Sequence, residues 1–173
     1  LKNMKMDYLK SEVKENVEIC NGIYSLKVIH DTIVKPGQFY MLKPKTAILR
    51  RPISVCEVNG NEITFVYAVV GKGTEEFKTL RNGDIIEIVG PLGNGFPYEK
   101  AEGKKVFLMG GGIGVPPILE LAKQMNCEKK QIVVGYRDAQ TFLKNEFEQN
   151  GELYISTEDG SVGTKGNVMD AIR

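Results

Sequence analysis

A run of glycines stands between a short apolar segment and a helix-like segment in the second half of the chain. Residues 110–117 read Gly-Gly-Gly-Ile-Gly-Val-Pro-Pro. Glycine lets the backbone turn tightly and approach a ligand closely, and the first turn of a helix offers unpaired N–H groups to a phosphate. Proline is tolerated there because those N–H groups lack helical partners. The pattern indicates a dinucleotide-binding turn, and the alternative is a tight strand-to-helix turn without a ligand.

Two stretches of the first half have residues that suit a phosphate. Residues 50–54 read Arg-Arg-Pro-Ile-Ser, and an arginine can hold a pyrophosphate through paired hydrogen bonds. Residues 71–74 read Gly-Lys-Gly-Thr after an apolar run, where Thr74 would cap a helix or bind a phosphate. A basic pair before an edge strand and an ordinary helix cap explain the same residues without a ligand. Arg50 is expected to matter less than Arg51 if it faces solvent.

An acidic turn follows an apolar segment near the end of the chain. Residues 157–161 read Thr-Glu-Asp-Gly-Ser. Ligands of parallel sheets bind beyond the carboxyl ends of the strands, where Glu158 and Asp159 would accept hydrogen bonds from a ribose and repel a 2′-phosphate. Arg137 could neutralise such a phosphate, but we expect it to face the pyrophosphate or the first half of the chain. The turn favours NAD(H) over NADP(H), and the alternative is an acidic loop without a ligand.

The elements that would position these residues change in character near residue 100. Before it, polar and apolar residues alternate over 24–28 and 63–69, which predicts half-buried strands. Asn59-Gly60 predicts a hairpin turn, residues 84–89 predict another strand, and one helix is expected from Thr74. Several strands joined by regular turns indicate a small antiparallel barrel.

After residue 100 the expected strands alternate with helices. The strands are expected over 106–109, 132–136 and 153–156, and the helices over 117–125, over 141–148 and from Asn167. Such alternation predicts a parallel sheet with crossover helices. The expected fold is an antiparallel β-barrel over residues 1–99, followed over residues 100–173 by a partial three-layer parallel α/β domain.

Composition excludes several classes of function. The 173 residues have a net charge of +1, so a polycationic surface for nucleic acid is not expected. The longest apolar run, 65–70, has six residues, too few to cross a membrane. The three cysteines, at 20, 56 and 127, lack the spacing of a metal knuckle or a disulfide framework, and we expect reduced thiols in a cytoplasmic protein. With His30 as the single histidine, we expect no metal ligand and no catalytic acid or base.

Taken in order, these motifs resemble those of the ferredoxin reductase-type flavoproteins, in which a flavin-binding barrel precedes a nicotinamide nucleotide domain. The order is 36–39 (Pro-Gly-Gln-Phe), 51–54, 71–74 and then the glycine run. Within that family the chain is most similar to the electron-transfer subunits of two-subunit, NAD-dependent dihydroorotate dehydrogenases. The stretches that carry this similarity are 49–54, 90–96 (Gly-Pro-Leu-Gly-Asn-Gly-Phe) and 159–166 (Asp-Gly-Ser-Val-Gly-Thr-Lys-Gly).

The resemblance implies a set of cofactor-binding residues. For FAD these are Arg51 near the pyrophosphate, Pro52, Ile53, Ser54 near the isoalloxazine ring, Val66, Tyr67, Ala68, Gly73 and Thr74. For NAD(H) they are Gly111, Gly112, Ile113, Gly114, Val115, Pro116, Arg137, Glu158 and Asp159. The implied reaction is hydride transfer between NAD(H) and flavin, for which the cofactor supplies the chemistry.

The resemblance also implies a partner. In the family, a cysteine-rich tail holds a [2Fe–2S] cluster that connects FAD to the FMN of a dihydroorotate dehydrogenase catalytic subunit in pyrimidine biosynthesis. The three cysteines here lack the spacing for such a cluster, so we expect the chain to be a fragment whose cluster region lies beyond Arg173. The alternatives are another reductase of this type, such as a sulfite reductase electron-transfer subunit, and a flavin-binding module without turnover.

Overall fold

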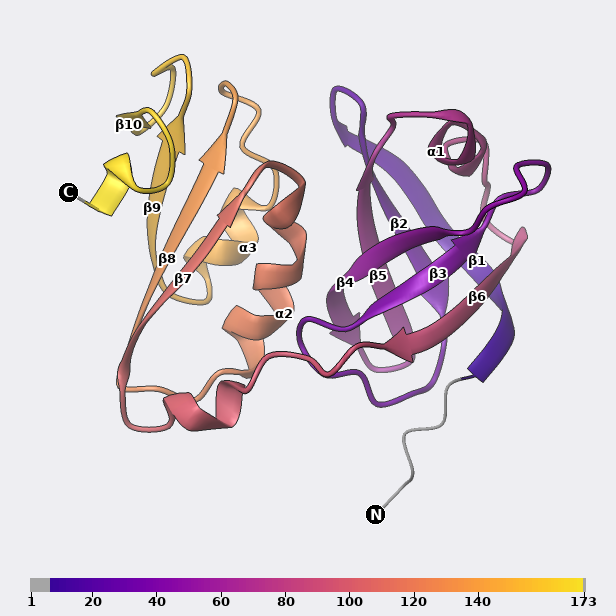
Figure 1. Ribbon diagram of the computed structural model, residues 1–173, viewed down its shortest axis with the longest axis horizontal. Helices are drawn as coiled ribbons and strands as arrows, with labels where there is room; N and C mark the ends of the chain where they lie inside the picture. The colour runs from indigo at the N-terminus through magenta and orange to yellow at the C-terminus, as the bar shows by residue number, and fades with distance from the viewer. Residues whose placement is uncertain (1–6, 173) are drawn as a thin grey trace. The chain divides into compact units, whose positions relative to one another are not determined.

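The computed structural model describes residues 7–172, which divide after Phe96 into two compact units. The first unit is built of strands and one short helix, and the second alternates strands with helices (Figure 1). The longest helix among the described residues has nine residues, and none of their helices is long and apolar enough to cross a membrane.

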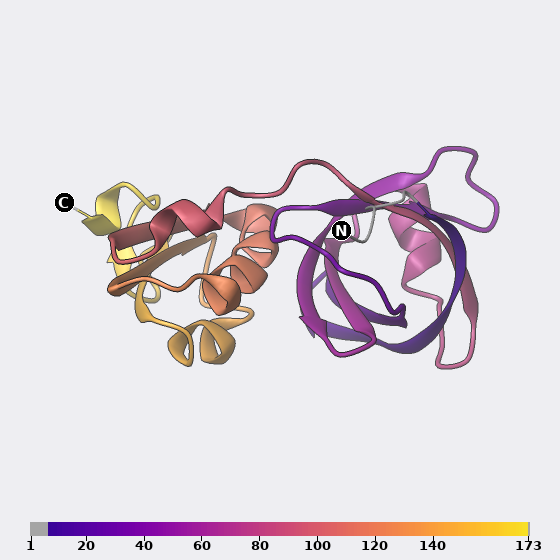
Figure 2. The ribbon, with the colours of Figure 1, turned by 90° about the horizontal axis from the view of Figure 1, so that it is seen from below.

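The first unit is a closed barrel of six antiparallel strands, in the order β1-β2-β5-β4-β3-β6. Figure 2 shows these strands as a ring. The strands are β1 (Asp7–Cys20), β2 (Ile23–Ile29), β3 (Phe39–Lys43), β4 (Arg51–Asn59), β5 (Glu62–Ala68) and β6 (Ile85–Leu92). The long strand β1 closes the ring, because residues 7–12 pair with β6 and the part from Val13 onward pairs with β2. The antiparallel barrel expected from the sequence is confirmed.

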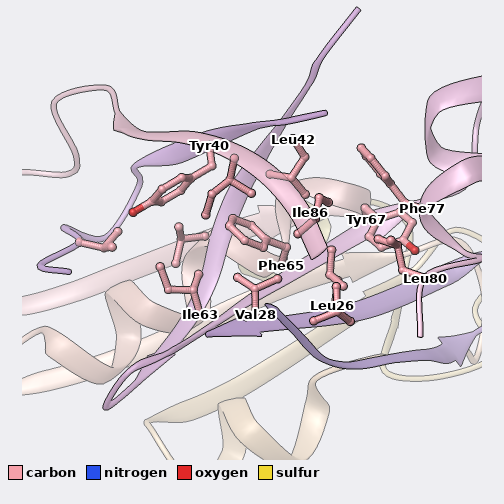
Figure 3. Close-up of a cluster of buried hydrophobic side chains, with 14 residues drawn as sticks. Leu26, Val28, Tyr40, Leu42, Ile63, Phe65, Tyr67, Phe77, Leu80 and Ile86 are labelled. Carbon is pink, nitrogen blue, oxygen red and sulfur yellow. The ribbon is translucent and has the colours of Figure 1, made fainter. Parts of the chain in front are cut away.

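The core of the barrel follows from the period-two alternation of the strands. Ile63, Phe65 and Tyr67 of β5 all point inward and are buried, as Figure 3 shows. The helix α1 (Lys72–Phe77) adds Phe77 to this core, where its ring meets that of Tyr67 edge to face at 5.8 Å. Burial of these large rings fixes α1 against the barrel, beside the start of β4.

The second unit is a parallel sheet in the order β10-β9-β8-β7. Its elements are η1 (Tyr98–Ala101), β7 (Lys105–Gly111), η2 (Gly112–Gly114), α2 (Pro116–Gln124), β8 (Lys129–Tyr136), α3 (Lys144–Glu148), β9 (Glu152–Thr157), β10 (Thr164–Lys165) and η3 (Asp170–Ile172). The parallel α/β part of the expected fold is therefore confirmed, and β10 adds a short fourth strand to the three that were expected.

The two helices of this unit cover one face of the sheet. Helix α2 packs on β7, α3 packs on β9, and the two helices contact each other. Gly110 of β7 faces Ile118 of α2, because a β-carbon on Gly110 would lie 3.0 Å from that side chain. By strand alternation, Phe107 and Met109 lie on the opposite face, where they are 56% and 43% exposed.

Two expected helices are shorter in the structure. The helix expected over 141–148 begins only at Lys144, because Leu143 adopts a left-handed conformation with φ 65° and residues 139–142 form tight turns. The helix expected from Asn167 is a single 3-10 turn, η3. There the backbone N–H of Asn167 donates to the carboxylate of Asp170 at 2.9 Å, which makes a local turn in place of a first helical turn.

Candidate functional site

The first candidate site lies where β4 begins beside α1. The side chain of Arg51 lies across Gly73, with its Nε 2.7 Å and its Cζ 2.9 Å from the position that a β-carbon on Gly73 would occupy. Its Nη1 donates to the backbone oxygen of Leu49 at 2.6 Å. The guanidinium is therefore held against a helix backbone that has no side chain at that point, and any larger residue at position 73 would displace it.

The turn in front of α1 is shaped by Thr74. Its hydroxyl donates to the backbone oxygen of Gly71 at 2.9 Å and accepts from the N–H groups of Val70 at 2.9 Å and Gly71 at 3.1 Å. The side chain is almost fully buried. Of the two roles that the sequence offers for Thr74, the structure shows the hydroxyl engaged in the cap.

The expected flavin-binding residues of β4 and β5 divide between the two faces of the barrel wall. Ile53 packs against the core and Tyr67 belongs to it. By alternation, the residues with side chains on the outer face are Pro52, Ser54, Val66 and Ala68. Val66 is buried, with 3% of its surface exposed. The outer face at this end of the two strands therefore offers Pro52, Ala68 and the hydroxyl of Ser54, which suits a flat, mostly apolar ring.

Tyr67 has a structural role inside the barrel. Its ring stacks on Tyr24 with centroids 5.7 Å apart, and its hydroxyl donates to Oδ1 of Asn16 at 3.1 Å. Burial raises the pKa of the Tyr67 phenol well above its ordinary value, more than the bond to Asn16 lowers it. On the outer surface, residue 67 offers only its backbone.

The loop that leads into Arg51 is held to α1 by Glu76. This carboxylate accepts from the N–H of Thr46 at 2.8 Å, from its hydroxyl at 2.5 Å and from the N–H of Ala47 at 2.9 Å. The hydrogen bonds from Thr46 lower the pKa of Glu76. Sequence analysis missed Glu76, because a glutamate in the first turns of a helix is common and nothing nearby indicates a loop partner.

Arg50 does not face solvent. Its Nη2 lies 3.2 Å from Oε2 of Glu87 and 3.0 Å from the hydroxyl of Tyr8, and its guanidinium lies 4.9 Å from the centre of the Tyr8 ring. The Arg50 side chain is only 22% exposed. The condition under which Arg50 was expected to matter little is therefore not met, since this residue ties the loop to β1 and β6.

The second candidate site is the glycine turn between β7 and α2. Gly110 is tightly packed, because a β-carbon there would lie 2.9 Å from the backbone oxygen of Gly114. Gly111, Gly112 and Gly114 differ, since nothing lies within 4 Å of the positions that their β-carbons would take. The turn thus leaves open space directly above its backbone, where a ligand can approach closely. The turn also includes Ile113, which is exposed, Val115, which is buried, and Pro116 at the start of α2.

The acidic turn and Arg137 lie at the same edge of the sheet as the glycine turn. In the parallel register, Gly111 pairs with Gly135, and Tyr136 pairs with Thr157. Beyond these ends, the backbone N–H of Glu158 donates to the backbone oxygen of Tyr136 at 3.1 Å. The N–H of Asp159 donates to the backbone oxygen of Arg137 at 3.2 Å. The structure therefore brings all the residues expected to bind NAD(H) to the carboxyl edge of one sheet.

The two carboxylates of the acidic turn differ in their surroundings. Oδ1 of Asp159 accepts from the N–H and the hydroxyl of Ser161, at 2.9 and 2.7 Å, and the bond from the hydroxyl is the main cause of its lowered pKa. Glu158 is exposed. Lys165 packs its aliphatic stem 3.1 Å from where a β-carbon on Gly160 would lie. Sequence analysis missed this cation, which reaches the turn only because β10 returns beside β9.

The described residues contain no group of three or more His, Cys, Asp or Glu side chains that could hold a metal ion. Cys56 is buried, and Cys20 and Cys127 are half-buried.

Comparison with known proteins finds relatives that share one description. Across 98% of its length, the chain is 49% identical to the electron transfer subunit of dihydroorotate dehydrogenase B (NAD(+)) from Clostridium perfringens, and it covers 70% of that protein. The subunit of the same description from Clostridium acetobutylicum is 42% identical, with 68% of its length covered. No protein-family model matches the chain.

Solved structures share the fold. The NADH-dependent reduced ferredoxin-NADP oxidoreductase, from work on flavin-based electron bifurcation, superposes with a TM-score of 0.84 and 28% identity, over 94% of this chain and 61% of that one. A flavohemoglobin from Malassezia yamatoensis with bound FAD and heme superposes with a TM-score of 0.76 and 18% identity, over 92% and 48% of the two chains.

Proposed function

We propose that this chain, which belongs to the family of dihydroorotate dehydrogenase B electron transfer subunits, binds FAD and NAD(H) and passes electrons between them. The family is one of ferredoxin reductase-like flavoproteins. We assign FAD to residues 1–99 and NAD(H) to residues 100–173. Bound FAD would supply the exchange between two-electron and one-electron steps, which no side chain of the protein can perform.

The observation that carries this proposal is the contact of Arg51 with Gly73. A β-carbon at position 73 would fill the place that the guanidinium takes. This contact sets a permanent cation against the backbone of a glycine turn, and a guanidinium can hold a pyrophosphate through paired hydrogen bonds. FAD contains a pyrophosphate, whereas FMN does not, so Arg51 and Gly73 would favour the dinucleotide.

The outer face of β4 and β5 would take the flavin ring. Ser54 is half-buried there and offers one hydroxyl that can donate or accept a hydrogen bond. Pro52 and Ala68 would contact the ring and the ribityl chain by apolar surface, and the buried Val66 would do so by its backbone. Ile53 and Tyr67 would act indirectly, because their side chains hold the wall of the barrel in place.

The glycine turn and the acidic turn would hold NAD(H). Gly111, Gly112 and Gly114 leave room for the pyrophosphate above the start of α2. Glu158 would accept hydrogen bonds from the ribose hydroxyls, and Asp159 would shape the turn through Ser161. The proposed roles of the side chains are to bind and orient the two cofactors, and none donates or removes a proton.

The proposed partner is a dihydroorotate dehydrogenase catalytic subunit that contains FMN. Electrons would leave the bound FAD toward the partner in pyrimidine biosynthesis.

The first experiment identifies the flavin and its reductant. Apoprotein reconstituted with a mixture of FAD and FMN should retain FAD, as chromatography of the released flavin would show. Retention of FMN alone, or of no flavin, would refute the assignment of the barrel. NADH should then bleach the flavin absorbance without oxygen.

A second experiment tests the choice of nucleotide. The rate of flavin reduction should be higher with NADH than with NADPH, and Glu158→Ala should reduce this preference more than Asp159→Ala, because the Asp159 carboxylate is already engaged. Lys165→Ala serves as a matched variant in the same turn, and it should sharpen the preference for NADH by removing a cation. Equal rates with both nucleotides in the unaltered protein would contradict the proposed role of the acidic turn.

A further inference from the structure

We infer that Glu76 is a positioning residue for FAD, which acts by holding residues 44–50 against α1 so that Arg51 stays in place. This inference rests on the proposed function, and it deepens it by assigning part of the FAD affinity to a side chain outside the proposed ligand contacts. It follows from how α1 is fixed, how the loop of residues 44–50 is attached to it, and how Arg51 depends on both.

Helix α1 is the fixed partner in this arrangement. The buried ring of Phe77 anchors the helix in the barrel core. Nδ2 of Asn16 in β1 donates to the backbone oxygens of Phe77 at 2.9 Å and of Leu80 at 3.2 Å. Oδ1 of the same amide accepts from the hydroxyl of Tyr67 in β5 at 3.1 Å. The helix is therefore tied to two strands of the barrel independently of Glu76.

The middle of the loop between β3 and β4 is held mainly by hydrogen bonds. Its large apolar side chains contribute little packing, because Ile48 and Leu49 are 88% and 71% exposed. The ammonium of Lys43 donates to the backbone oxygen of Ile48 at 3.2 Å, which ties the loop to its own start. Glu76 accepts three hydrogen bonds from residues 46–47 and thereby attaches the loop to α1.

The geometry at Glu76 suits a carboxylate and no other side chain of similar size. Oε1 accepts from the hydroxyl of Thr46 and the N–H of Ala47, and Oε2 accepts from the N–H of Thr46. A carboxylate accepts at both oxygens, whereas the amide of glutamine has one oxygen and one NH₂ group. Glutamine at this position would point a donor at one of the backbone N–H groups and keep at most two of the three bonds.

Arg51 depends on the loop and on the helix at once. Its Nη1 donates to the backbone oxygen of Leu49 at 2.6 Å, and its guanidinium lies against Gly73. Leu49 follows the attached Ala47 closely in the chain, so the position of its carbonyl depends on the attachment at Glu76. Without that attachment, a pyrophosphate would have to order the Arg51 side chain and its loop as it binds. Ordering one long side chain on binding lowers an affinity by about two- to twelvefold.

The test measures the FAD affinity of apoproteins of the full chain, with flavin fluorescence as the readout. Glu76→Ala removes all three bonds and should weaken FAD binding by about five- to tenfold, whereas Glu76→Gln should weaken it by about two- to threefold. Glu75→Ala and Glu75→Gln are the matched controls. Glu75 has the same charge on the same helix, but it pairs with Lys78 at 2.6 Å and not with the loop. Both control variants should keep the full FAD affinity.

A double-mutant cycle separates positioning from a general structural role. Because Glu76 acts through Arg51, Glu76→Ala should cause no further loss of FAD affinity in a protein that already has Arg51→Ala. A role in the fold at large would instead weaken FAD binding to the same degree in both backgrounds. Trypsin reports on the loop itself, since Lys45 precedes the N–H of Thr46 that Glu76 binds. Cleavage after Lys45 should be faster in the apoprotein of Glu76→Ala than in that of Glu75→Ala.

The outcomes separate this inference from the proposed function. Full FAD affinity in Glu76→Ala, in a protein that binds FAD, would overturn the role of Glu76 and leave the proposed function standing. An equal loss with and without Arg51 would also overturn it, because Glu76 would then act on another part of the site. An equal loss in the Glu75 variants would overturn it too, since the charge of the helix would then govern the affinity. Failure of the unaltered protein to bind FAD would overturn both.

Discussion

Substitution of Gly73 by alanine is expected to weaken FAD binding without weakening the fold. The new methyl group would lie 2.7 Å from Nε and 2.9 Å from Cζ of Arg51, so the guanidinium must move. These atoms are near the end of a flexible side chain, which can swing away without moving the backbone. Alanine is favoured over glycine in a helix by about 1 kcal/mol, so the thermal midpoint of the apoprotein should stay the same or rise.

The size of the effect follows from what the displaced guanidinium would bind. A hydrogen bond to a charged group contributes about 1.5–3 kcal/mol, which corresponds to an affinity lower by about 10- to 150-fold. Gly73→Ala and Arg51→Ala should each weaken FAD binding within this range. Because both remove the same contact, the double variant should bind no more weakly than the weaker single variant. Fluorescence titration of the apoproteins with FAD measures all four affinities.

Gly71→Ala is the matched control. Gly71 belongs to the same turn, its backbone is extended, and nothing lies within 4 Å of the position of its β-carbon. It should bind FAD as the unaltered protein does. The reasoning would be refuted if Gly73→Ala kept full affinity, or if the losses of Gly73→Ala and Arg51→Ala added in the double variant.

Three further predictions concern stability. The Tyr8 hydroxyl, more than the nearby arginine, lowers the pKa of Glu87 below its ordinary value. A carboxylate of this kind stabilises the fold above its unfolded pKa and loses that contribution as the pH falls through its folded pKa. The thermal midpoint should therefore fall as the pH is lowered below the ordinary range of a glutamate, and it should fall less steeply in Glu87→Gln. Gly163→Ala should destabilise the α/β unit by more than about 3 kcal/mol in urea titrations, because its methyl group would overlap the carbonyl oxygen of Ile155 in β9. Gly103→Ala is the control, since Gly103 has a similar φ and nothing lies within 4 Å of the position of its β-carbon. It should cost about 1–2 kcal/mol. Burial raises the pKa of Tyr67, so its phenol should stay neutral near pH 10, where exposed tyrosines ionise. Ultraviolet titration of the folded protein should therefore show the same number of tyrosines ionising near pH 10 in Tyr67→Phe as in the unaltered protein. The stability that the neutral phenol contributes should be lost as the pH rises above 10.

The outline of the fold could be predicted because strand alternation and strand–helix alternation are local properties. Residues 24–28 and 63–69 alternate as half-buried strands do, and they fall largely within β2 and β5. The glycine run could be placed between a strand and a helix for the same reason. The single strand β1, with its fourteen residues, could not be predicted, because its polar residues are numerous and its two halves pair with different partners.

The parts of the site that escaped prediction depend on contacts between distant segments. Arg51 and Gly73 were each expected to bind a phosphate, but their mutual contact depends on how α1 packs on the barrel. The attachment of the loop by Glu76 and the position of Lys165 over Gly160 depend on tertiary structure in the same way. Leu143 shows the limit at short range, because a leucine in a left-handed conformation has no signature in the sequence.

The double pairing of β1 brings the first and last strands of the barrel unit together. Asp7 pairs with Gly90, and the ladder continues to Glu12 opposite Ile85. The chain therefore enters and leaves the barrel unit at neighbouring points, as it does in domains that tolerate insertion or circular permutation. A barrel of this construction can be joined to different neighbours through short linkers without opening its ring of hydrogen bonds, so recombination of genes can exchange the neighbours while the barrel stays intact.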